Sequence, residues 1–183
     1  MKQKNLRYLL FVNLFSLIGF YTYAPLYALF ADSLGIGAKE ISFIWSGYSM
    51  ILAASILFFG KIGNNKSKGK LLVVGYFGCA IGAVLLLLVR DQTSLILALA
   101  INAIAGGMSL PAHKALFAKN ESLGRESEQW SWLDAGATFS AAAGSALGGI
   151  VIGLYGFQGI FVAMASIQFV AAIVAYRAIY RLQ

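Results

Sequence analysis

The sequence predicts an all-α membrane protein, a single domain over residues 1–183 that folds as a bundle of six transmembrane helices. Three observations predict it: six apolar stretches fill almost the whole chain, charged residues make up only 11% of it, and the basic residues gather on one side of the expected membrane. The mean hydropathy is +0.77. Because about a quarter of the residues of a soluble domain are charged, we exclude a soluble globular protein.

Each of the six stretches is long enough to cross a bilayer, which takes roughly 20 mostly apolar residues. Helices are expected, since inside lipid a segment must pair its own backbone polar groups. The expected spans are 8–31, 41–62, 70–89, 94–118, 130–154 and 157–178. Short links join them, so we expect successive helices to be antiparallel neighbours, with a tight corner at Tyr155-Gly156. Pro25 and Pro111 are expected to bend the first and fourth spans.

The distribution of basic residues predicts the topology. If the spans alternate in direction, all of the 14 Lys and Arg except Lys39 and Arg90 fall on one side. This is the positive-inside pattern, and it predicts cytoplasmic N- and C-termini in a multi-pass protein of the cell membrane, a prokaryotic plasma or inner membrane. These residues would anchor the helices and contact membrane lipid head groups. The net charge of +7 therefore does not indicate nucleic-acid binding.

Polar residues at helical spacing predict an internal cavity. Side chains three and four residues apart share one helix face, and the first, second, fourth and fifth spans carry such polar stripes. We expect these four helices to wrap a polar surface, with the third and sixth spans outside. The alternative is a dry bundle with hydrogen bonds between helices. The candidates for contact with a small-molecule substrate are Asn13, Tyr23, Trp45, Asn102 and Thr138.

Two titratable residues fall near the cytoplasmic ends of neighbouring spans. His113 is the single histidine, and Asp134 is the single acid placed inside a span. Acids inside a membrane are rare and usually functional, and a His–Asp pair could take up a proton near neutral pH. The alternatives are a structural histidine and an ion pair of Asp134 with Lys114 or Lys61.

Small residues at four-residue spacing in the fifth span predict close helix packing, because they let a second helix approach in lipid. One set includes Gly136, Gly144 and Gly148, and a second set on another face includes Gly149. These four glycines are the expected helix-packing residues.

Several segments together resemble one six-helix half of a Major Facilitator Superfamily (MFS) transporter. Between the second and third spans that family has a cytoplasmic signature of the form Gly-x-Leu-x-Asp-Arg-x-Gly-Arg-Arg/Lys. Here Gly60, Ile62 and Lys68 match it in kind, whereas Asn64 stands in the position of the acid. In the fourth span, Asn102 stands where the family has a membrane arginine.

The fifth span and its turn into the sixth add to the resemblance. The glycine pattern from Gly144 to Gly153 and the segment from Tyr155 to Phe161 are similar to the family's fifth helix and the following turn. In this stretch Gly149 takes the place of the proline of the antiporter version. The resemblance covers essentially the whole chain.

The resemblance implies a secondary active transporter that moves a small solute by alternating access. Such transporters bind substrate between two six-helix halves, so this chain would need a homodimer or a second six-helix chain, unless it is a truncated product. The alternative is a non-transporting interaction or scaffold protein derived from a transporter half. The uncharged Asn64 and the missing arginine favour that alternative, and the polar stripes favour transport.

Enzymatic activity is not expected. The sequence has no phosphate-binding glycine loop, no nucleophile elbow and no cluster of metal ligands. We therefore expect no catalytic residues, no cofactor and no metal. Cys79 is the single cysteine, and we interpret it as a small core residue.

Overall fold

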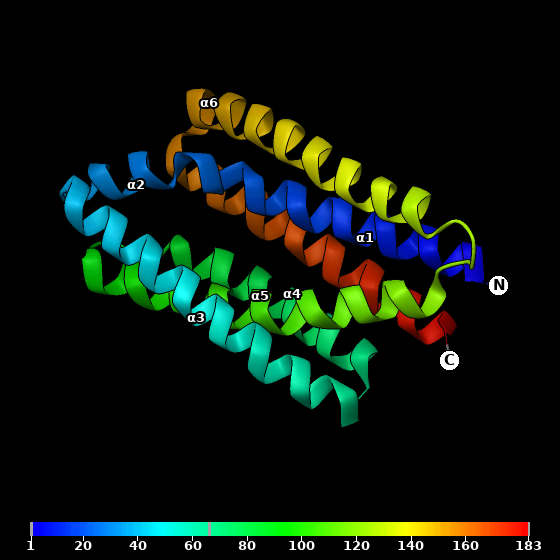
Figure 1. The fold of residues 1–183 in the computed structure, drawn as a ribbon. Coiled ribbons are helices and arrows are strands. Elements are labelled where there is room, and N and C mark those ends of the chain that lie inside the picture. The colour runs from blue at the N-terminus through cyan, green and yellow to red at the C-terminus, as the bar shows by residue number, and fades with distance from the viewer. Residues whose placement is uncertain (1, 66, 183) are drawn as a thin grey trace.

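The computed structural model describes residues 2–65 and 67–182, and every regular element in that part of the chain is helical (Figure 1). The elements are α1 (Lys2–Tyr23), η1 (Ala24–Leu26), α2 (Tyr27–Ser33), α3 (Ala38–Asn65), α4 (Lys68–Leu86), α5 (Gln92–Asn120) and α6 (Glu126–Leu182).

The first predicted span is interrupted at Pro25. The α-helical hydrogen-bonding pattern stops at Tyr23, a short 3₁₀ turn follows, and α2 continues in a new direction (Figure 1). Proline has no backbone N–H and its ring collides with the preceding turn, which explains the break. The bend expected at Pro25 is confirmed, whereas α5 continues as one helix through Pro111.

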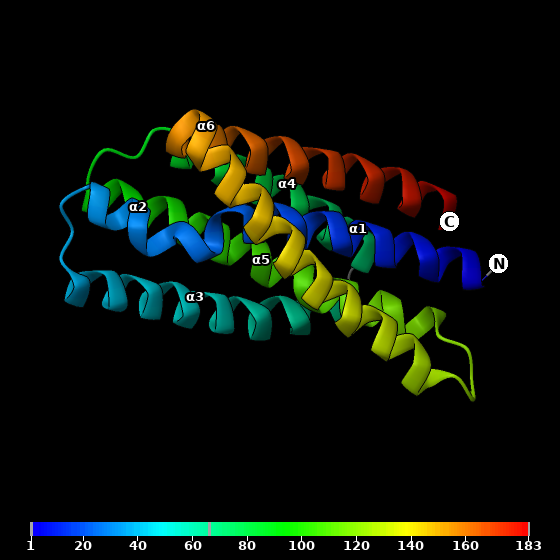
Figure 2. The ribbon, with the colours of Figure 1, turned by 90° about the horizontal axis from the view of Figure 1, so that it is seen from above.

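Helix α6 turns back on itself at Gly156. A straight helix of its 57 residues would be about 85 Å long, far more than the ~30 Å hydrocarbon core of a bilayer. Gly156 has φ 64° and ψ −164°, a conformation that is essentially restricted to glycine. The chain therefore reverses here into a first arm, 126–155, and a second arm, 157–182 (Figures 1 and 2).

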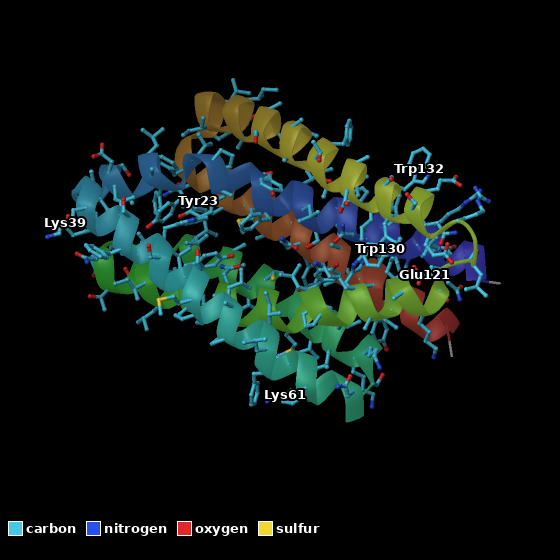
Figure 3. All side chains as sticks on the ribbon, viewed as in Figure 1. Tyr23, Lys39, Lys61, Glu121, Trp130 and Trp132 are labelled. Atoms are coloured by element: carbon cyan, nitrogen blue, oxygen red, sulfur yellow. The ribbon has the colours of Figure 1, made fainter. Side chains whose placement is uncertain are left out.

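The reversal lies at the predicted corner. Five helical segments of the described chain are long and apolar enough to cross a membrane, and the last of them contains Gly156. The count of six crossings stays a prediction. Both chain ends lie at the same end of the bundle (Figure 1), which we call the terminal end, and Lys39 lies at the opposite end (Figure 3). The assignment of the terminal end to the cytoplasm also stays a prediction.

The expectation that successive helices pack as neighbours is wrong for much of the bundle. Helices α4 and α5 do pack together, but α1 packs mainly against α6, and α3 packs against α5. The reason is that α1 is held by both arms of α6. Ser140 of the first arm donates a hydrogen bond to the Leu14 carbonyl (3.1 Å), and Gln168 of the second arm donates one to the Ser16 carbonyl (3.0 Å).

Aromatic rings fill the bundle at the end opposite the terminal end. The rings of Tyr27 and Trp45 are 4.8 Å apart, and those of Phe30 and Phe161 are also 4.8 Å apart. The Tyr27 hydroxyl donates to the Ile41 carbonyl at 3.0 Å, which ties α2 to α3. These contacts close the bundle at that end and leave a polar space in its middle.

Candidate functional site

A cavity of about 160 Å³ lies between α1, α3, α4, α5 and the second arm of α6. Its polar wall includes Asn13, Ser16, Tyr76, Asn102, His113 and Gln168. No Asp, Glu, Lys or Arg of the described chain lines it. The cavity therefore offers neutral hydrogen-bonding groups and aromatic rings, without a fixed charge.

Gln168 and Ser16 form the best-paired polar contact on this wall. The Ser16 hydroxyl donates to Gln168 Oε1 at 3.1 Å, and Gln168 Nε2 donates to the Ser16 carbonyl at 3.0 Å. Gly19 lets the Gln168 side chain pack closely against α1, because a Cβ on Gly19 would lie only 3.3 Å from Gln168 Cγ. Sequence reasoning did not single out Gln168. The signal that could have found it is an amide within an otherwise apolar span, which needs a partner in lipid.

Asn102 is held against α4. Its side chain is 9% exposed, and its amide donates to the Ala98 carbonyl at 3.4 Å. A Cβ on Gly82 would collide with the Asn102 amide, and one on Gly78 would lie 2.8 Å from Ala105 Cβ. The spacing of Gly75, Gly78 and Gly82 is the signal for this contact, and sequence reasoning overlooked it.

The expectation that the third and sixth spans lie outside the polar surface is wrong. Tyr76 and Cys79 of α4, and Gln168 of the second arm of α6, all line the cavity. A single polar residue per span is enough to reach the cavity when small residues let that helix approach closely.

His113 joins α5 to α1 at the edge of the cavity. It is only 3% exposed, and its Nε2 lies 3.0 Å from the Leu9 carbonyl. A backbone carbonyl only accepts hydrogen bonds, so Nε2 carries the hydrogen and Nδ1 is the ring atom left to accept a proton. The ring stacks against Phe117, with the centroids 6.4 Å apart.

Asp134 does not pair with His113 in this structure. Asp134 is exposed on the first arm of α6, whereas His113 is buried. Of the residues that the structure describes, Arg125 and Glu128 form the ion pair, and neither Lys114 nor Lys61 bonds to Asp134. The two candidates therefore face different surroundings.

Tyr23 and Trp45 do not line the cavity but lie next to residues that do. A small void of about 10 Å³ touches both, together with Phe20, Tyr48 and Asn102, and this is about the room of one water molecule. Tyr23 is 2% exposed, and its hydroxyl is the buried side-chain polar atom without a hydrogen-bond partner in the described chain. An unpaired buried hydroxyl costs free energy, and the void beside it has room for a water molecule that could pair with it.

Thr138 faces away from the cavity. It is exposed, and its hydroxyl donates to the Asp134 carbonyl at 3.0 Å. Ser42, Ser46 and Ser49 of α3 are likewise exposed and bond to their own helix. Two helices thus present small and hydroxyl side chains on the outside of the bundle.

The two glycine sets of α6 have different neighbours. A Cβ on Gly144 would lie 2.7 Å from the Ile18 carbonyl, one on Gly148 would collide with the Thr22 carbonyl, and one on Gly136 would lie 4.0 Å from Leu14. At Gly144 and Gly148 this set packs the first arm closely on α1, whereas at Gly136 the contact is loose. Gly149 and Gly153 have nothing within 4 Å of an added Cβ. No other helix of the described chain therefore packs on this second set, which we call the unoccupied stripe.

The segment that resembles the family signature runs from α3 into α4. Gly60 lies near Pro111 of α5, at 3.9 Å from an added Cβ. Asn64 is exposed, and Lys68 is half-buried in the first turn of α4. Lys66 lies outside the described residues.

Comparison with known proteins gives one family. The family model for the Major Facilitator Superfamily matches residues 9–182. The match covers all the helices that line the cavity.

Three curated proteins are similar to this chain. Two are multidrug resistance proteins MdtG, from Proteus mirabilis (strain HI4320; 28% identity over 161 residues) and Dickeya zeae (strain Ech586; 27% over 157). The third is the riboflavin transporter RibZ of Clostridioides difficile (strain 630; 21% over 141). The matches cover 85%, 83% and 77% of this chain but 40%, 38% and 31% of those proteins. The chain thus spans well under half the length of the curated relatives it matches.

Proposed function

Because the chain belongs to the Major Facilitator Superfamily, a family of transporters, we propose that it serves as one six-helix half of a secondary active transporter. It moves a small solute by alternating access, together with a second six-helix unit, in a bacterial cell membrane. The family match and the names of the relatives, a multidrug resistance protein and a riboflavin transporter, support this proposal.

The observation that carries the proposal is the cavity between α1, α3, α4, α5 and the second arm of α6, whose lining combines neutral polar groups with apolar side chains and has no Asp, Glu, Lys or Arg. An unpaired polar group inside a membrane bundle is costly, so such a group usually has a function. Asn102 and Tyr23 are incompletely paired here. A buried charge without a counter-ion is costly, so a wall without charged residues favours a neutral or amphipathic solute.

The second unit packs on the outward faces of α3 and the first arm of α6. These faces carry Ser42, Ser46 and Ser49 on one helix and Thr138 and Gly149 on the other. Small residues allow close helix approach in lipid. In a homodimer with a two-fold axis along the membrane normal, the same two stripes meet their copies; in a heterodimer they meet another six-helix chain.

Cross-linking in proteoliposomes tests the pairing. Cys79→Ser removes the single cysteine, and Gly149→Cys or Gly153→Cys then places one thiol on the unoccupied stripe. A short bifunctional reagent is expected to link two copies through either thiol. Val162→Cys is the matched control, because Val162 is 53% exposed on the second arm and is expected not to cross-link.

Solute flux tests the transport itself. Vesicles that contain the cross-linkable dimer are expected to take up a neutral aromatic solute, and the Asn102→Ala and Gln168→Ala variants are expected to lose that uptake. A monomer that is not cross-linked and produces no flux would instead support the scaffold alternative.

A further inference from the structure

A groove runs between α1 and the first arm of α6, starting at the terminal end of the bundle. It has two sections. The outer section, of about 410 Å³, includes Arg7, Arg125 and Glu128 in its lining, and the inner one, of about 310 Å³, includes Leu14 and Phe139. Leu10 and Trp132 belong to both linings, so the two sections adjoin.

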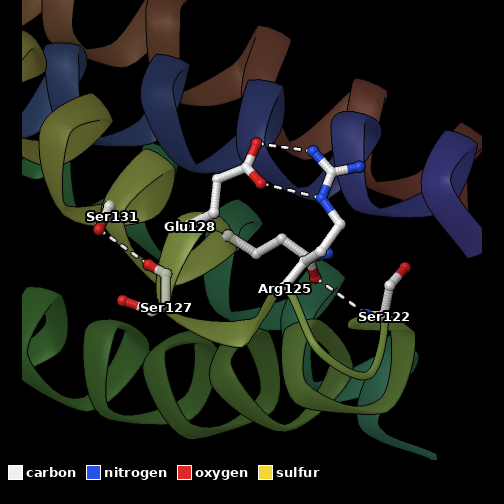
Figure 4. Close-up of polar contacts among 6 residues, drawn as sticks. Ser122, Arg125, Ser127, Glu128 and Ser131 are labelled. Atoms are coloured by element: carbon white, nitrogen blue, oxygen red, sulfur yellow. Dashed lines mark hydrogen bonds and ion pairs between the residues drawn. The ribbon is translucent and has the colours of Figure 1, made fainter.

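The outer section carries a net charge of +1. Arg7 is exposed, and Arg125 makes a two-pronged ion pair with Glu128, with Nε at 2.9 Å and Nη2 at 2.7 Å from the carboxylate oxygens (Figure 4). A guanidinium has five N–H donors, so this pair leaves three donors of Arg125 free. The hydrogen bonds to Glu128 also raise the pKa of Arg125, which keeps it charged.

The inner section is apolar, apart from Asn13 at its edge. Leu14 and Phe139 lie one and two helical turns further from the terminal end than Leu10 and Trp132. Small residues keep the space open, because Ala135 and Gly136 form part of the lining and an added Cβ on Gly136 meets only Leu14, at 4.0 Å.

Trp132 marks the boundary between the two sections. Its side chain is 63% exposed, and it lies on the first arm of α6 near the terminal end (Figure 3). Tryptophan collects where membrane hydrocarbon meets the head groups. The cationic section is therefore expected at head-group depth and the apolar section at acyl-chain depth.

We propose that this groove binds one phospholipid of net charge −1 from the leaflet at the terminal end. The phosphate binds Arg7 and the free N–H groups of Arg125, and an acyl chain lies along Leu10, Leu14 and Phe139. The phosphate charge balances the +1 of the outer section, and the apolar inner section distinguishes a lipid from a soluble anion.

The groove is separate from the surface that is expected to hold the second six-helix unit. Trp132 and Phe139 are seven residues apart and share one side of the first arm, whereas Thr138, Ser145 and Gly149 lie on another side. A lipid in the groove and a partner on the unoccupied stripe would therefore occupy different faces of the first arm.

Native mass spectrometry of the purified full-length chain tests the proposal with three probes: phosphatidylglycerol, phosphatidylcholine and glycerol 3-phosphate. Phosphatidylglycerol is expected to bind about fivefold more tightly than phosphatidylcholine, as each basic side chain near head groups contributes at that level. Glycerol 3-phosphate, which has no acyl chain, is expected neither to bind nor to displace the lipid. Equal binding of both lipids, or displacement by glycerol 3-phosphate, would overturn the proposal.

Two pairs of variants locate the site. Arg7→Gln is expected to remove the preference for phosphatidylglycerol, whereas Lys61→Gln, exposed and outside the groove, keeps it. Ala135→Leu fills the inner section and is expected to weaken binding, whereas Ala142→Leu, exposed on the same arm outside the groove, leaves it unchanged. Equal effects within either pair would contradict the assignment. The measurement needs neither a dimer nor transport, so its outcome is independent of the proposed function.

Discussion

At the scale of single residues, the Tyr23 hydroxyl stands out as a buried polar atom without a hydrogen-bond partner in the described chain. The Tyr23 ring is buried among aromatic rings, 5.4 Å from that of Phe161, so the ring is fixed and only the hydroxyl lacks a partner. Its neighbour in sequence and space, Tyr27, has a full hydrogen bond to Ile41. The two tyrosines therefore allow a matched comparison.

Removal of the two hydroxyls is expected to affect stability differently. Tyr27→Phe loses a hydrogen bond and should lower the free energy of unfolding by about 0.5–1.5 kcal/mol. Tyr23→Phe removes an unpaired polar atom and should leave the free energy of unfolding unchanged or raise it by up to ~1 kcal/mol. Thermal unfolding in detergent measures both. Equal destabilisation by the two variants would show that the Tyr23 hydroxyl has a partner.

The Ser16–Gln168 contact should appear as an energetic coupling between α1 and α6. A double-mutant cycle of Ser16→Ala and Gln168→Leu removes the hydroxyl, the amide, or both. Interhelical hydrogen bonds in membranes average about 0.6 kcal/mol and reach ~1.7 kcal/mol, and we expect a coupling in that range. The free energy of unfolding of the four proteins provides the measurement, and a coupling near zero would mean that the two side chains act independently.

At the scale of elements, adjacent glycines of α6 have different roles. Gly148 lies against the Thr22 carbonyl of α1, whereas Gly149 has open space around it. Gly148→Ala should therefore lower the free energy of unfolding by about 1–3 kcal/mol, the usual cost of overpacking. Gly149→Ala should leave the monomer's stability unchanged or raise it by up to ~1 kcal/mol, because alanine favours a helix more than glycine does. Chemical denaturation of the two variants compares them directly, and equal losses would place Gly149 inside the packed bundle.

The start of α5 should respond to pH. Asp91 accepts hydrogen bonds from the backbone N–H of Ser94 at 2.8 Å and from its hydroxyl at 3.0 Å, and these bonds lower the pKa of Asp91 below its ordinary 3.8. The cap is thus fully formed above that ordinary value and is lost as the pH falls through the lowered pKa. Protection of the Ser94 amide from hydrogen exchange should fall with it. Asp91→Asn, which caps without ionising, should remove this pH dependence.

At the scale of the whole molecule, the unoccupied stripe on the first arm is the feature that calls for a second unit. Gly149→Leu adds a large side chain that the monomer can accommodate, since nothing lies within 4 Å of the added Cβ. The variant is expected to fold as the wild type does but to lose both association and solute flux. Cross-linking yield and uptake in vesicles measure the two effects. Unchanged association would place the partner elsewhere.

The sequence by itself determined the helices and their breaks. Apolar length set the membrane segments, Pro25 set the break after α1, and Gly156 set the reversal in α6, because each depends on the local chemistry of the backbone. The spacing of Gly144 and Gly148 likewise predicted a close helix contact. Periodicity also identified Asn13, Asn102 and His113 as residues that share polar faces.

Only the tertiary structure decided which neighbour each face meets. It put α1 between the two arms of α6, joined Gln168 to Ser16, gave Asn102 the room left by Gly82, and separated Asp134 from His113. The physical reason is that helix periodicity specifies the residues on a face but not its partner. In a membrane the outside of the bundle is as apolar as its interior, so hydrophobicity cannot rank the possible arrangements, and close contacts between small and polar side chains determine the one that forms.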